Sequence, residues 1–128
     1  MSGDPLAAFR IEMNPAAPLA GTPLCRRDEL PDPGSRGFSW EVGGQVFKAF
    51  LIHLKSQVFG YVDACPHAGW PLVGAGQQYL NSEASAVICR VHGARFIPEN
   101  GHWINVPDVE GLITWPVEVR SDDIVYVA

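Results

Sequence analysis

The sequence predicts an all-β protein made of short antiparallel strands. The first reason is an apolar period of two, as where Phe38, Trp40 and Val42 alternate with Ser39 and Glu41. The second is that glycine- and proline-rich turns separate such segments at short intervals. The third is that apolar residues almost never recur at helical spacing. At 128 residues, the chain is long enough to fold as one domain.

The chain begins with a segment that lacks any sustained period. Residues 1–23 are rich in alanine and proline, which predicts a flexible tail packed loosely on a domain spanning 24–128. Cys25 is expected to be a small buried residue rather than a redox thiol. Residues 31–34 (Pro-Asp-Pro-Gly) are typical of a turn.

Three strands are expected next. The first covers 37–42 and turns at Gly43-Gly44, because a tight hairpin can need positive φ at both central positions. The second, 45–55, is apolar on both faces, with Val46 on one of them, and so is expected to be covered on both sides. The third, 57–63, leads directly into Cys65.

The remaining strands are shorter. Residues 73–85 are expected to form an irregular connection, and Trp40 and Trp115 are expected in the core. The later strands are expected at 86–88, 95–97, 103–104, 115–119 and 124–127.

Two segments of this framework carry the chemistry. Cys65 and His67 form a C-x-H motif, Cys89 and His92 form a C-x-x-H motif, and 21 residues separate His67 from Cys89. Thiolate and imidazole ligands suit zinc, copper or an iron–sulfur centre. One Cys and one His on each of two loops, about 64–72 and 89–96, could hold a tetrahedral zinc or a [2Fe–2S] cluster. The ligand types alone leave both open.

The residues around these motifs resemble the Rieske family over roughly residues 24–127. Those that carry the resemblance are Cys65-Pro66-His67 with Gly69, Pro71 and Leu72, then Cys89, His92, Gly93 and Phe96, then Asn100-Gly101 and Asn105-Val106-Pro107. The resemblance implies an antiparallel β-sandwich of Rieske type, starting with a strand near residue 23. It also implies a small cluster-binding subdomain that carries the two ligand loops.

The resemblance also implies a ligand set. Cys65 and Cys89 would bind one iron of a [2Fe–2S] cluster, and His67 and His92 would bind the other, near the tip of the protein. The residues expected to surround the cluster are Gly69, Trp70, Gly93, Ala94 and Pro107. Trp103 lies next to a ligand loop and, like Trp70, is expected to shield the cluster from water.

Departures from the respiratory Rieske proteins predict a low reduction potential. Trp70 and Val91 stand where those proteins have the two cysteines of an inter-loop disulfide, so no such bridge can form. Ala94 and Phe96 stand where those proteins have Ser and Tyr hydroxyls that bond cluster or ligand sulfur. Because lost donors stabilise the reduced cluster less, we expect a potential near the low end of the range of about −150 to +300 mV.

The resemblance implies a one-electron carrier without catalytic residues. Its partners would be a reductase and an oxygenase or another redox acceptor. The only other histidines, His53 and His102, are expected to be structural or exposed, and they are too few for the mononuclear iron site of an oxygenase. The alternatives are a small Rieske-like subunit of a larger oxidoreductase, similar to that of nitrite reductase, and a structural Cys2His2 zinc module.

Composition limits the remaining classes. A net charge of −5 argues against a nucleic-acid partner. The sequence contains no apolar run long enough to span a membrane, and residues 1–5 do not resemble a secretion signal, so we expect no membrane partner. With two of three cysteines assigned to the metal site, no disulfide framework is expected, which favours the cytoplasm.

Overall fold

The computed structural model describes residue 11 and residues 14–64, 66, 72, 78–89, 93–106 and 109–128. Within these residues the chain forms strands and one short 3-10 helix, which confirms the predicted all-β class. The elements are β1 (Pro23–Arg26), η3 (Arg27–Glu29), β2 (Gly34–Val42), β3 (Gln45–Leu54), β4 (Gln57–Val62), β5 (Val87–Ile88), β6 (Arg95–Phe96), β7 (Val117–Val119) and β8 (Ile124–Val127).

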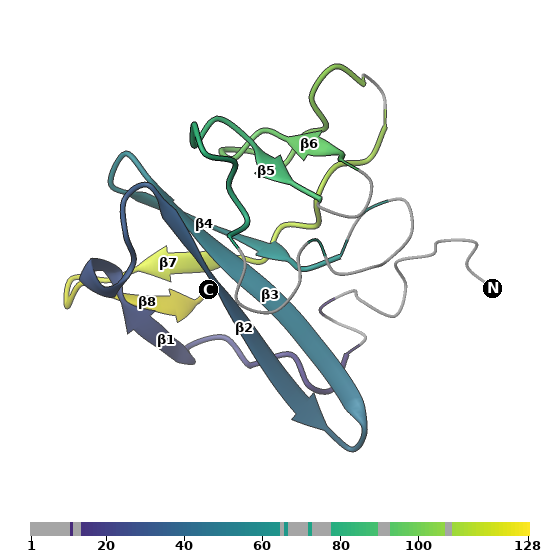
Figure 1. Ribbon diagram of the computed structural model, residues 1–128. Coiled ribbons are helices and arrows are strands. Elements are labelled where there is room, and N and C mark those ends of the chain that lie inside the picture. Colours follow the sequence, from purple (N-terminus) through teal and green to yellow (C-terminus); the bar gives the residue numbers. More distant parts are fainter. Residues whose placement is uncertain are drawn as a thin grey trace.

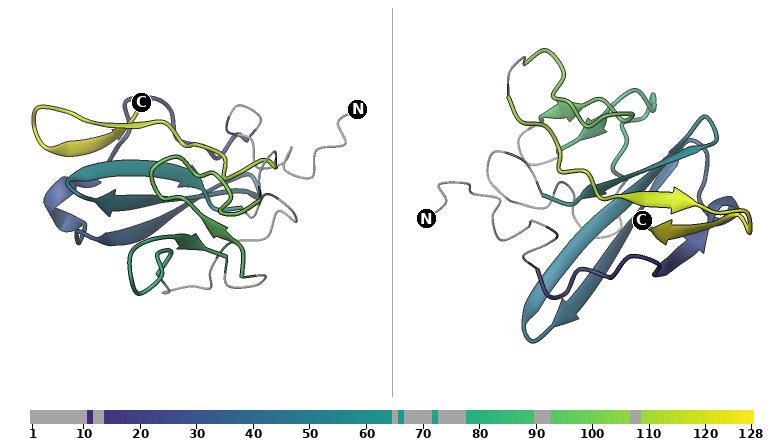
Figure 2. Two further views of the ribbon diagram at one scale, coloured as in Figure 1. Left: turned by 90° about the horizontal axis from the view of Figure 1, so that it is seen from above. Right: turned by 180° about the vertical axis from the view of Figure 1, so that it is seen from behind.

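The strands form three antiparallel sheets, with the orders β1-β8-β7, β2-β3-β4 and β5-β6. The long strands of the second sheet cross the molecule (Figure 1). In Figure 2, left, the β5-β6 sheet lies on one side of these strands and β7 and β8 lie on the other. The predicted sandwich with a separate small subdomain is therefore confirmed.

The β2–β3 hairpin turns at the predicted glycines. Gly43 and Gly44 have φ values of 55° and 83°, and the flanking residues Val42 and Gln45 pair with each other. Both positive φ values suit a two-residue hairpin, in which residues with a side chain would be strained. The strand before the turn begins at Gly34, three residues earlier than predicted, because its first residues already pair with β3.

Strand β3 is buried on both faces, as its sequence predicts. Phe47, Ala49 and Leu51 pack in one hydrophobic cluster, toward the β1-β8-β7 sheet. Phe50 and Ile52 pack in a second cluster on the opposite face, together with residues of the β5-β6 sheet. Val46, on the Phe50 face, is 42% exposed because it lies near the hairpin end of β3, opposite the exposed Glu41.

Trp115 lies at the centre of the first cluster and is fully buried. Its ring centroid is 5.7 Å from that of Trp40 and 6.0 Å from that of Phe47, both in edge-on geometry. The predicted core role of Trp115 and Trp40 is confirmed. The expected strand at 115–119 starts only at Val117, because the Trp115 N–H donates to the Gly60 carbonyl and so pairs with β4 instead.

The described part of the N-terminal segment contacts the domain. Asn14 Nδ2 donates to the Val46 carbonyl at 2.9 Å, and Gly21 N–H donates to the Val127 carbonyl at 2.7 Å. Ala16 is 3% exposed and belongs to the first cluster. The flexibility of residues 1–23 and the boundary at residue 24 stay predictions.

Replacing Gly60 with alanine is expected to destabilise the fold. A Cβ at this position would lie 2.5 Å from the Trp115 carbonyl oxygen and 3.3 Å from its Cε3 atom. Overpacking of this kind costs about 1–3 kcal/mol. Urea unfolding should therefore show a lower midpoint for Gly60→Ala, whereas Ser39→Ala, on the exposed side of β2, should unfold like wild type. Equal midpoints for all three proteins would contradict this packing.

Candidate metal centre

The second ligand loop closes the β5–β6 hairpin. Cys89 N–H donates to the Ala94 carbonyl at 2.9 Å, directly after the Val87–Phe96 and Ile88–Arg95 pairs of the two strands. The Gly93 N–H donates to the Cys89 carbonyl at 2.7 Å. Backbone hydrogen bonds therefore fix the two ends of a very short turn, and the cysteine stands at one of them.

Neighbouring segments extend this hairpin into a wider sheet. Leu80 forms a β-bridge with Val87, and Trp103 forms one with Phe96. Phe96 is fully buried, and its ring lies 5.4 Å from the half-buried Trp103 ring. The Cys89 side chain is also fully buried, in the same hydrophobic cluster. The protein thus holds this cysteine on a rigid base and away from water.

The first ligand loop starts at the end of β4. The Asp63 N–H donates to the Lys48 carbonyl at 2.9 Å and so extends the β3–β4 ladder by one residue. Beyond it, Ala64 is fully buried and Pro66 is buried. Leu72, near the other end of the loop, is fully buried as well. The described parts of this loop are therefore packed against the domain.

A buried carboxylate ties this loop to the rest of the fold. Asp63 is 5% exposed; its Oδ1 accepts the Leu72 N–H at 2.7 Å, and its Oδ2 accepts the Tyr79 hydroxyl at 2.8 Å. Burial raises the pKa of the Asp63 carboxyl, and the two hydrogen bonds and Lys48 oppose that rise. The sequence interpretation missed these residues. The available signal was an acidic residue at the end of an otherwise apolar strand.

The structure brings the described ends of both loops together. Leu72 from the first loop shares one hydrophobic cluster with Cys89 and Ala94 from the second. Gly93 and Ala94 lie beside Cys89 through backbone hydrogen bonds, and their place around a cluster stays a prediction. The predicted site residues that lie outside the described ones are Cys65, His67, Gly69, Trp70, His92 and Pro107.

No group of three or more His, Cys, Asp or Glu side chains in the described part of the chain is placed to hold a metal ion. Three of the four predicted ligands, Cys65, His67 and His92, are not among the described residues, so such a group is not expected there. The residues that are described fit a cluster site. They offer a buried thiol on a short turn, and no described residue other than its chain neighbours has an atom within 4 Å of where a Cβ of Gly93 would be.

Among the described residues, the hydrophobic cluster around Cys89 is poor in hydroxyl donors. Ala94 and Phe96, both buried, carry no polar side-chain atom. The buried Tyr61 hydroxyl donates to the Pro98 carbonyl at 2.6 Å, and that of Tyr79 donates to Asp63. Both tyrosine hydroxyl protons are thus engaged by protein oxygens.

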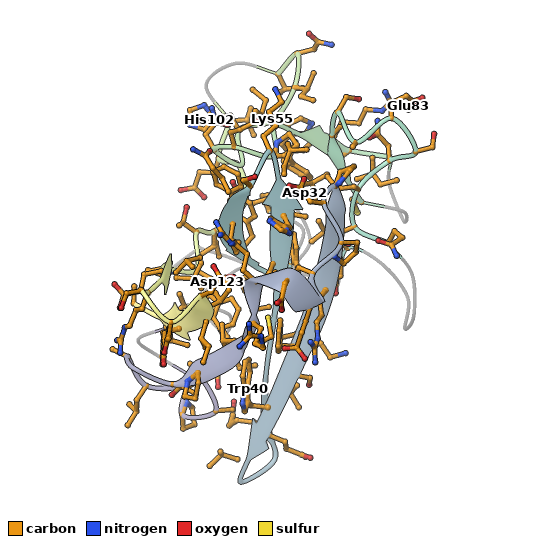
Figure 3. The ribbon with its side chains drawn as sticks, turned by 90° about the vertical axis from the view of Figure 1, so that its left-hand side faces the viewer. Asp32, Trp40, Lys55, Glu83, His102 and Asp123 are labelled. Carbon is orange, nitrogen blue, oxygen red and sulfur yellow. The ribbon has the colours of Figure 1, made fainter. Side chains whose placement is uncertain are left out.

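The two remaining histidines lie apart from this centre or at the surface. His53 is buried, and its Nδ1 lies 3.0 Å from the Leu30 carbonyl oxygen. In the tautomer with a proton on Nδ1, the ring donates a hydrogen bond to that carbonyl. The predicted structural role of His53 agrees with this contact. Its Nε2 is 3.7 Å from Asp32. His102 is exposed, as predicted, and Figure 3 shows it at the end of the molecule opposite Trp40.

Cys25 is also structural. It lies in β1 and is 8% exposed, within the cluster around Trp115. Burial raises the pKa of the Cys25 thiol, which keeps it protonated and unreactive. The expected buried role of Cys25 is confirmed.

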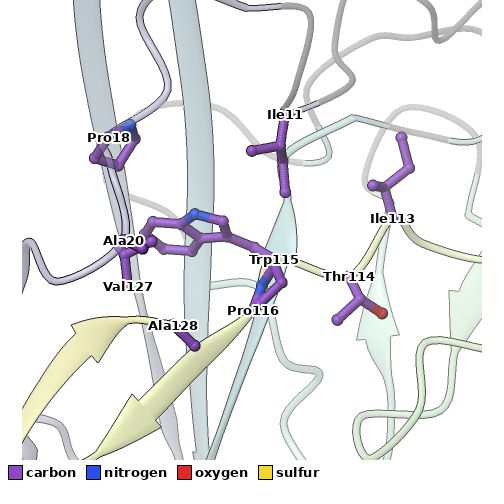
Figure 4. Close-up of a pocket in the computed structure, with 9 residues that line it drawn as sticks. All are labelled: Ile11, Pro18, Ala20, Ile113, Thr114, Trp115, Pro116, Val127 and Ala128. Carbon is purple, nitrogen blue, oxygen red and sulfur yellow. The ribbon is translucent and has the colours of Figure 1, made fainter.

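A pocket of about 400 Å³ opens beside Trp115 (Figure 4). Its described wall comes from the N-terminal segment, the chain before β7 and the end of β8, and these lining residues include neither Cys nor His. The Trp115 Nε1 atom is the buried side-chain nitrogen without a hydrogen-bond partner in the described part of the protein. The pocket therefore does not belong to the metal centre.

Comparison with known proteins decides between the two kinds of metal site. A model of the Rieske [2Fe-2S] domain family matches residues 21–116, which is most of the chain. The chain belongs to the Rieske [2Fe-2S] domain family. Its cofactor is therefore a Rieske-type [2Fe–2S] cluster, and this Rieske protein acts as a one-electron carrier rather than as an enzyme.

Individual relatives agree with this assignment. The chain is 29% identical to the ferredoxin subunit of 3-phenylpropionate/cinnamic acid dioxygenase from Photorhabdus laumondii subsp. laumondii, over 79% of this chain and 88% of the relative. It also shares the fold of a chain in the complex of reduced oxygenase and oxidized ferredoxin of carbazole 1,9a-dioxygenase, with a TM-score of 0.62, 23% identity and coverage of 83% and 99%.

A third structure shares this fold. It is a putative small subunit of NADH-dependent nitrite reductase from Mycobacterium tuberculosis, with a TM-score of 0.59, 20% identity and coverage of 83% and 91% of the two chains.

Among the described residues of the Rieske protein, no helix is long and apolar enough to cross a membrane.

Gly93 is expected to tolerate asparagine better than alanine. Its φ of 72° is unfavourable for residues with a Cβ, but asparagine adopts it more readily than alanine. Because no described residue other than its chain neighbours lies within 4 Å of the added Cβ, backbone strain should decide the result. Gly93→Ala should lose about 1–2 kcal/mol of unfolding free energy in urea, and Gly93→Asn should lose less. An equal loss in both variants would show that φ does not control this turn.

Tyr61 is expected to make stability fall at alkaline pH. Burial, with a contribution from Glu99, raises the pKa of its hydroxyl from 10.0 to about 12 in the folded protein. Since the folded state holds this proton more tightly, the stabilisation is complete below pH 10 and is lost as the pH rises toward about 12. The slope is at most about 1.4 kcal/mol per pH unit.

Urea unfolding between pH 9 and about 12 tests this expectation. The Tyr61→Phe variant should lose less stability over that interval than wild type, because it has no hydroxyl to ionise. If both proteins lose stability in parallel, Tyr61 is not the group responsible.

Proposed function

We propose that this Rieske protein is the ferredoxin component of an oxygenase system, accepting one electron from a reductase and delivering it to a terminal oxygenase. The observation that carries the proposal is its similarity, over 79% of this chain and 88% of the relative, to a dioxygenase ferredoxin subunit. Its fold is also that of a ferredoxin solved in complex with an oxygenase. Such a role suits a small protein whose described centre consists of one predicted ligand, Cys89, and the residues that pack around it.

We further propose that Cys65 and Cys89 bind one iron and that His67 and His92 bind the other. The chemistry of the donor set supports this assignment, because two thiolates and two neutral imidazoles are the ligands of a Rieske cluster. The location of Leu72 and Cys89 in one hydrophobic cluster supports it too, because a described residue of each loop then lies in the same part of the core. When bound, the cluster supplies a centre that takes up and releases one electron.

The chain's own residues hold that centre and control its surroundings. The β5–β6 hairpin orients Cys89, and the hydrophobic cluster under it excludes water from the thiolate side. Val106 and Val109, on either side of Pro107 in the sequence, are 37% and 43% exposed. We propose that the histidine side faces the partner protein and that the protein works in the cytoplasm, as its cysteine content predicts.

The similarity to a nitrite reductase small subunit favours a second candidate, in which the chain is a permanent subunit of a larger oxidoreductase. The two candidates differ in stability of association. Affinity purification of the full chain from its native host distinguishes them. A stoichiometric flavin or haem subunit that persists through gel filtration supports the second candidate and contradicts a free carrier.

The ligand assignment predicts that Cys89, and not Cys25, is required for the visible absorption of the protein. Cys89→Ala should abolish the visible absorption and the electron paramagnetic resonance (EPR) signal of dithionite-reduced protein, because an iron loses its anchoring thiolate. Cys25→Ala is the matched control, since it also removes a buried thiol but should keep both signals. Loss of both signals in the Cys25 variant, or their retention in the Cys89 variant, would contradict the assignment.

The hydroxyl-poor environment predicts a low midpoint potential. A spectroscopic redox titration should give a value below zero, toward the lower part of the range of about −150 to +300 mV. Introducing a donor with Phe96→Tyr should raise it, because a hydroxyl stabilises the more negative reduced cluster. A wild-type midpoint well above zero would refute this explanation.

A further inference from the structure

We propose that Asp63 is a positioning residue for the electron-transfer centre: its carboxylate clamps the first ligand loop to the β-framework and thereby sets the geometry and the potential of the cluster. This inference rests on the family cofactor and on the proposed ligands Cys65 and His67. It concerns a residue that is not itself a ligand and that the sequence motifs do not mark.

The first argument is the pair of contacts that Asp63 makes. One carboxylate oxygen accepts the Leu72 N–H at 2.7 Å, nine residues along the chain, and the other accepts the Tyr79 hydroxyl at 2.8 Å, 16 residues along the chain. The chain between Asp63 and Leu72 contains Cys65 and His67. Asp63 therefore closes the first ligand loop across its two ends.

The second argument is that Tyr79 is itself held in place. Its ring stacks on Phe50 with centroids 4.1 Å apart and planes 9° apart, and its N–H donates to Ser35 Oγ at 3.1 Å. Its carbonyl accepts the Ile88 N–H at 2.9 Å, one residue before Cys89. Tyr79 thus connects β2 and β3 to the clamp and to the strand that delivers the second ligand loop.

Strand β2 leaves room for the hydrogen bond between the Tyr79 hydroxyl and Asp63. A Cβ on Gly37 in β2 would lie only 2.7 Å from the Tyr79 hydroxyl oxygen. Any larger residue at this position would push the hydroxyl away from Asp63. The clamp therefore depends on a glycine that no turn or positive φ in the described backbone requires.

The negative charge of the Asp63 carboxylate also bears on the potential of the cluster. Asp63 lies two residues from Cys65, so their Cα atoms are at most about 7 Å apart. The Asp63 side chain is 5% exposed and so poorly screened by solvent, and a negative charge near the cluster would disfavour adding an electron to it. The clamp and the low potential expected for this protein would then have a common origin.

A second Asp–Tyr pair in the chain provides a matched control for substitutions of Asp63 and Tyr79. At the β7–β8 turn, Asp122 Oδ1 accepts the Ile124 N–H at 3.1 Å and Oδ2 accepts the Tyr126 hydroxyl at 2.6 Å. This is the same pair of contacts, but it is exposed and lies outside both ligand loops. Substitutions there remove the same groups without touching the centre.

The test compares Asp63→Asn, Tyr79→Phe and Gly37→Ala with Asp122→Asn and Tyr126→Phe. Each purified holoprotein is measured at one pH for its midpoint potential, the EPR g-values of its reduced state, its iron content and its thermal midpoint. Asp63→Asn keeps an acceptor for the Leu72 N–H but removes the charge, so its potential should shift upward. Tyr79→Phe and Gly37→Ala should change the g-values and lower iron retention.

The double variant Asp63→Asn/Tyr79→Phe supplies an internal check. Because both residues act through one contact, Tyr79→Phe should change the g-values less in the Asp63→Asn background than in wild type. The two control substitutions should leave potential, g-values and iron content unchanged.

Wild-type potential and g-values in all three clamp variants, with only the thermal midpoint lowered, would overturn the proposal and reduce Asp63 to a stabilising residue. An equal shift in the control variants would overturn it too. Failure of the proposed ligand set would look different, because wild-type protein itself would then lack the iron signal.

Discussion

The burial of β3 on both faces is the constraint on which the rest of this structure depends. Its odd-numbered residues, such as Phe47 and Leu51, pack around Trp115, and its even-numbered residues, such as Phe50 and Ile52, pack beneath the ligand loops. One strand therefore belongs to both hydrophobic clusters. The small β5-β6 sheet, next to the predicted ligand Cys89, therefore packs on the same sheet that holds the main core.

This arrangement suits a protein that transfers an electron without catalysis. A carrier benefits when its centre changes little in geometry between the two oxidation states. Here the Cys89 turn continues a hairpin, and the segment after the first ligand loop is anchored at Tyr79 by stacking on Phe50. Both anchors lead back to the β2-β3-β4 sheet. Three buried polar groups in this part of the described structure, the Asp63 carboxylate and the Tyr61 and Tyr79 hydroxyls, are fixed by specific partners.

Much of the architecture could be predicted from the sequence because local chemistry decides it. The Gly43-Gly44 hairpin follows from its need for positive φ, and the two-sided burial of β3 follows from its apolar residues on both faces. At Trp115, by contrast, the local pattern did not predict the strand boundary. Its alternation with Val117 and Val119 suggested one continuous strand, but tertiary pairing with Gly60 places it against β4.

The site was predictable only in part, for a similar reason. Ligands such as Cys89 are recognisable because metal chemistry permits few residue types at few spacings. Asp63, Tyr79 and Gly37 were missed because their roles depend on contacts between segments distant in the sequence, and no local pattern encodes such a contact. The cluster ligands Cys65, His67 and His92 lie outside the described residues, so their assignment rests on chemistry and on family membership.

The most direct test of the central claim is electron–nuclear double resonance of the reduced protein labelled with ¹⁵N in histidine. The account predicts two strongly coupled histidine nitrogens. It also predicts that the couplings are unchanged when His53 and His102 are both replaced by glutamine, because neither is a ligand. A paramagnetic cluster without histidine nitrogen coupling, or couplings that disappear in the His53→Gln/His102→Gln variant, would contradict the assignment of His67 and His92 to the cluster.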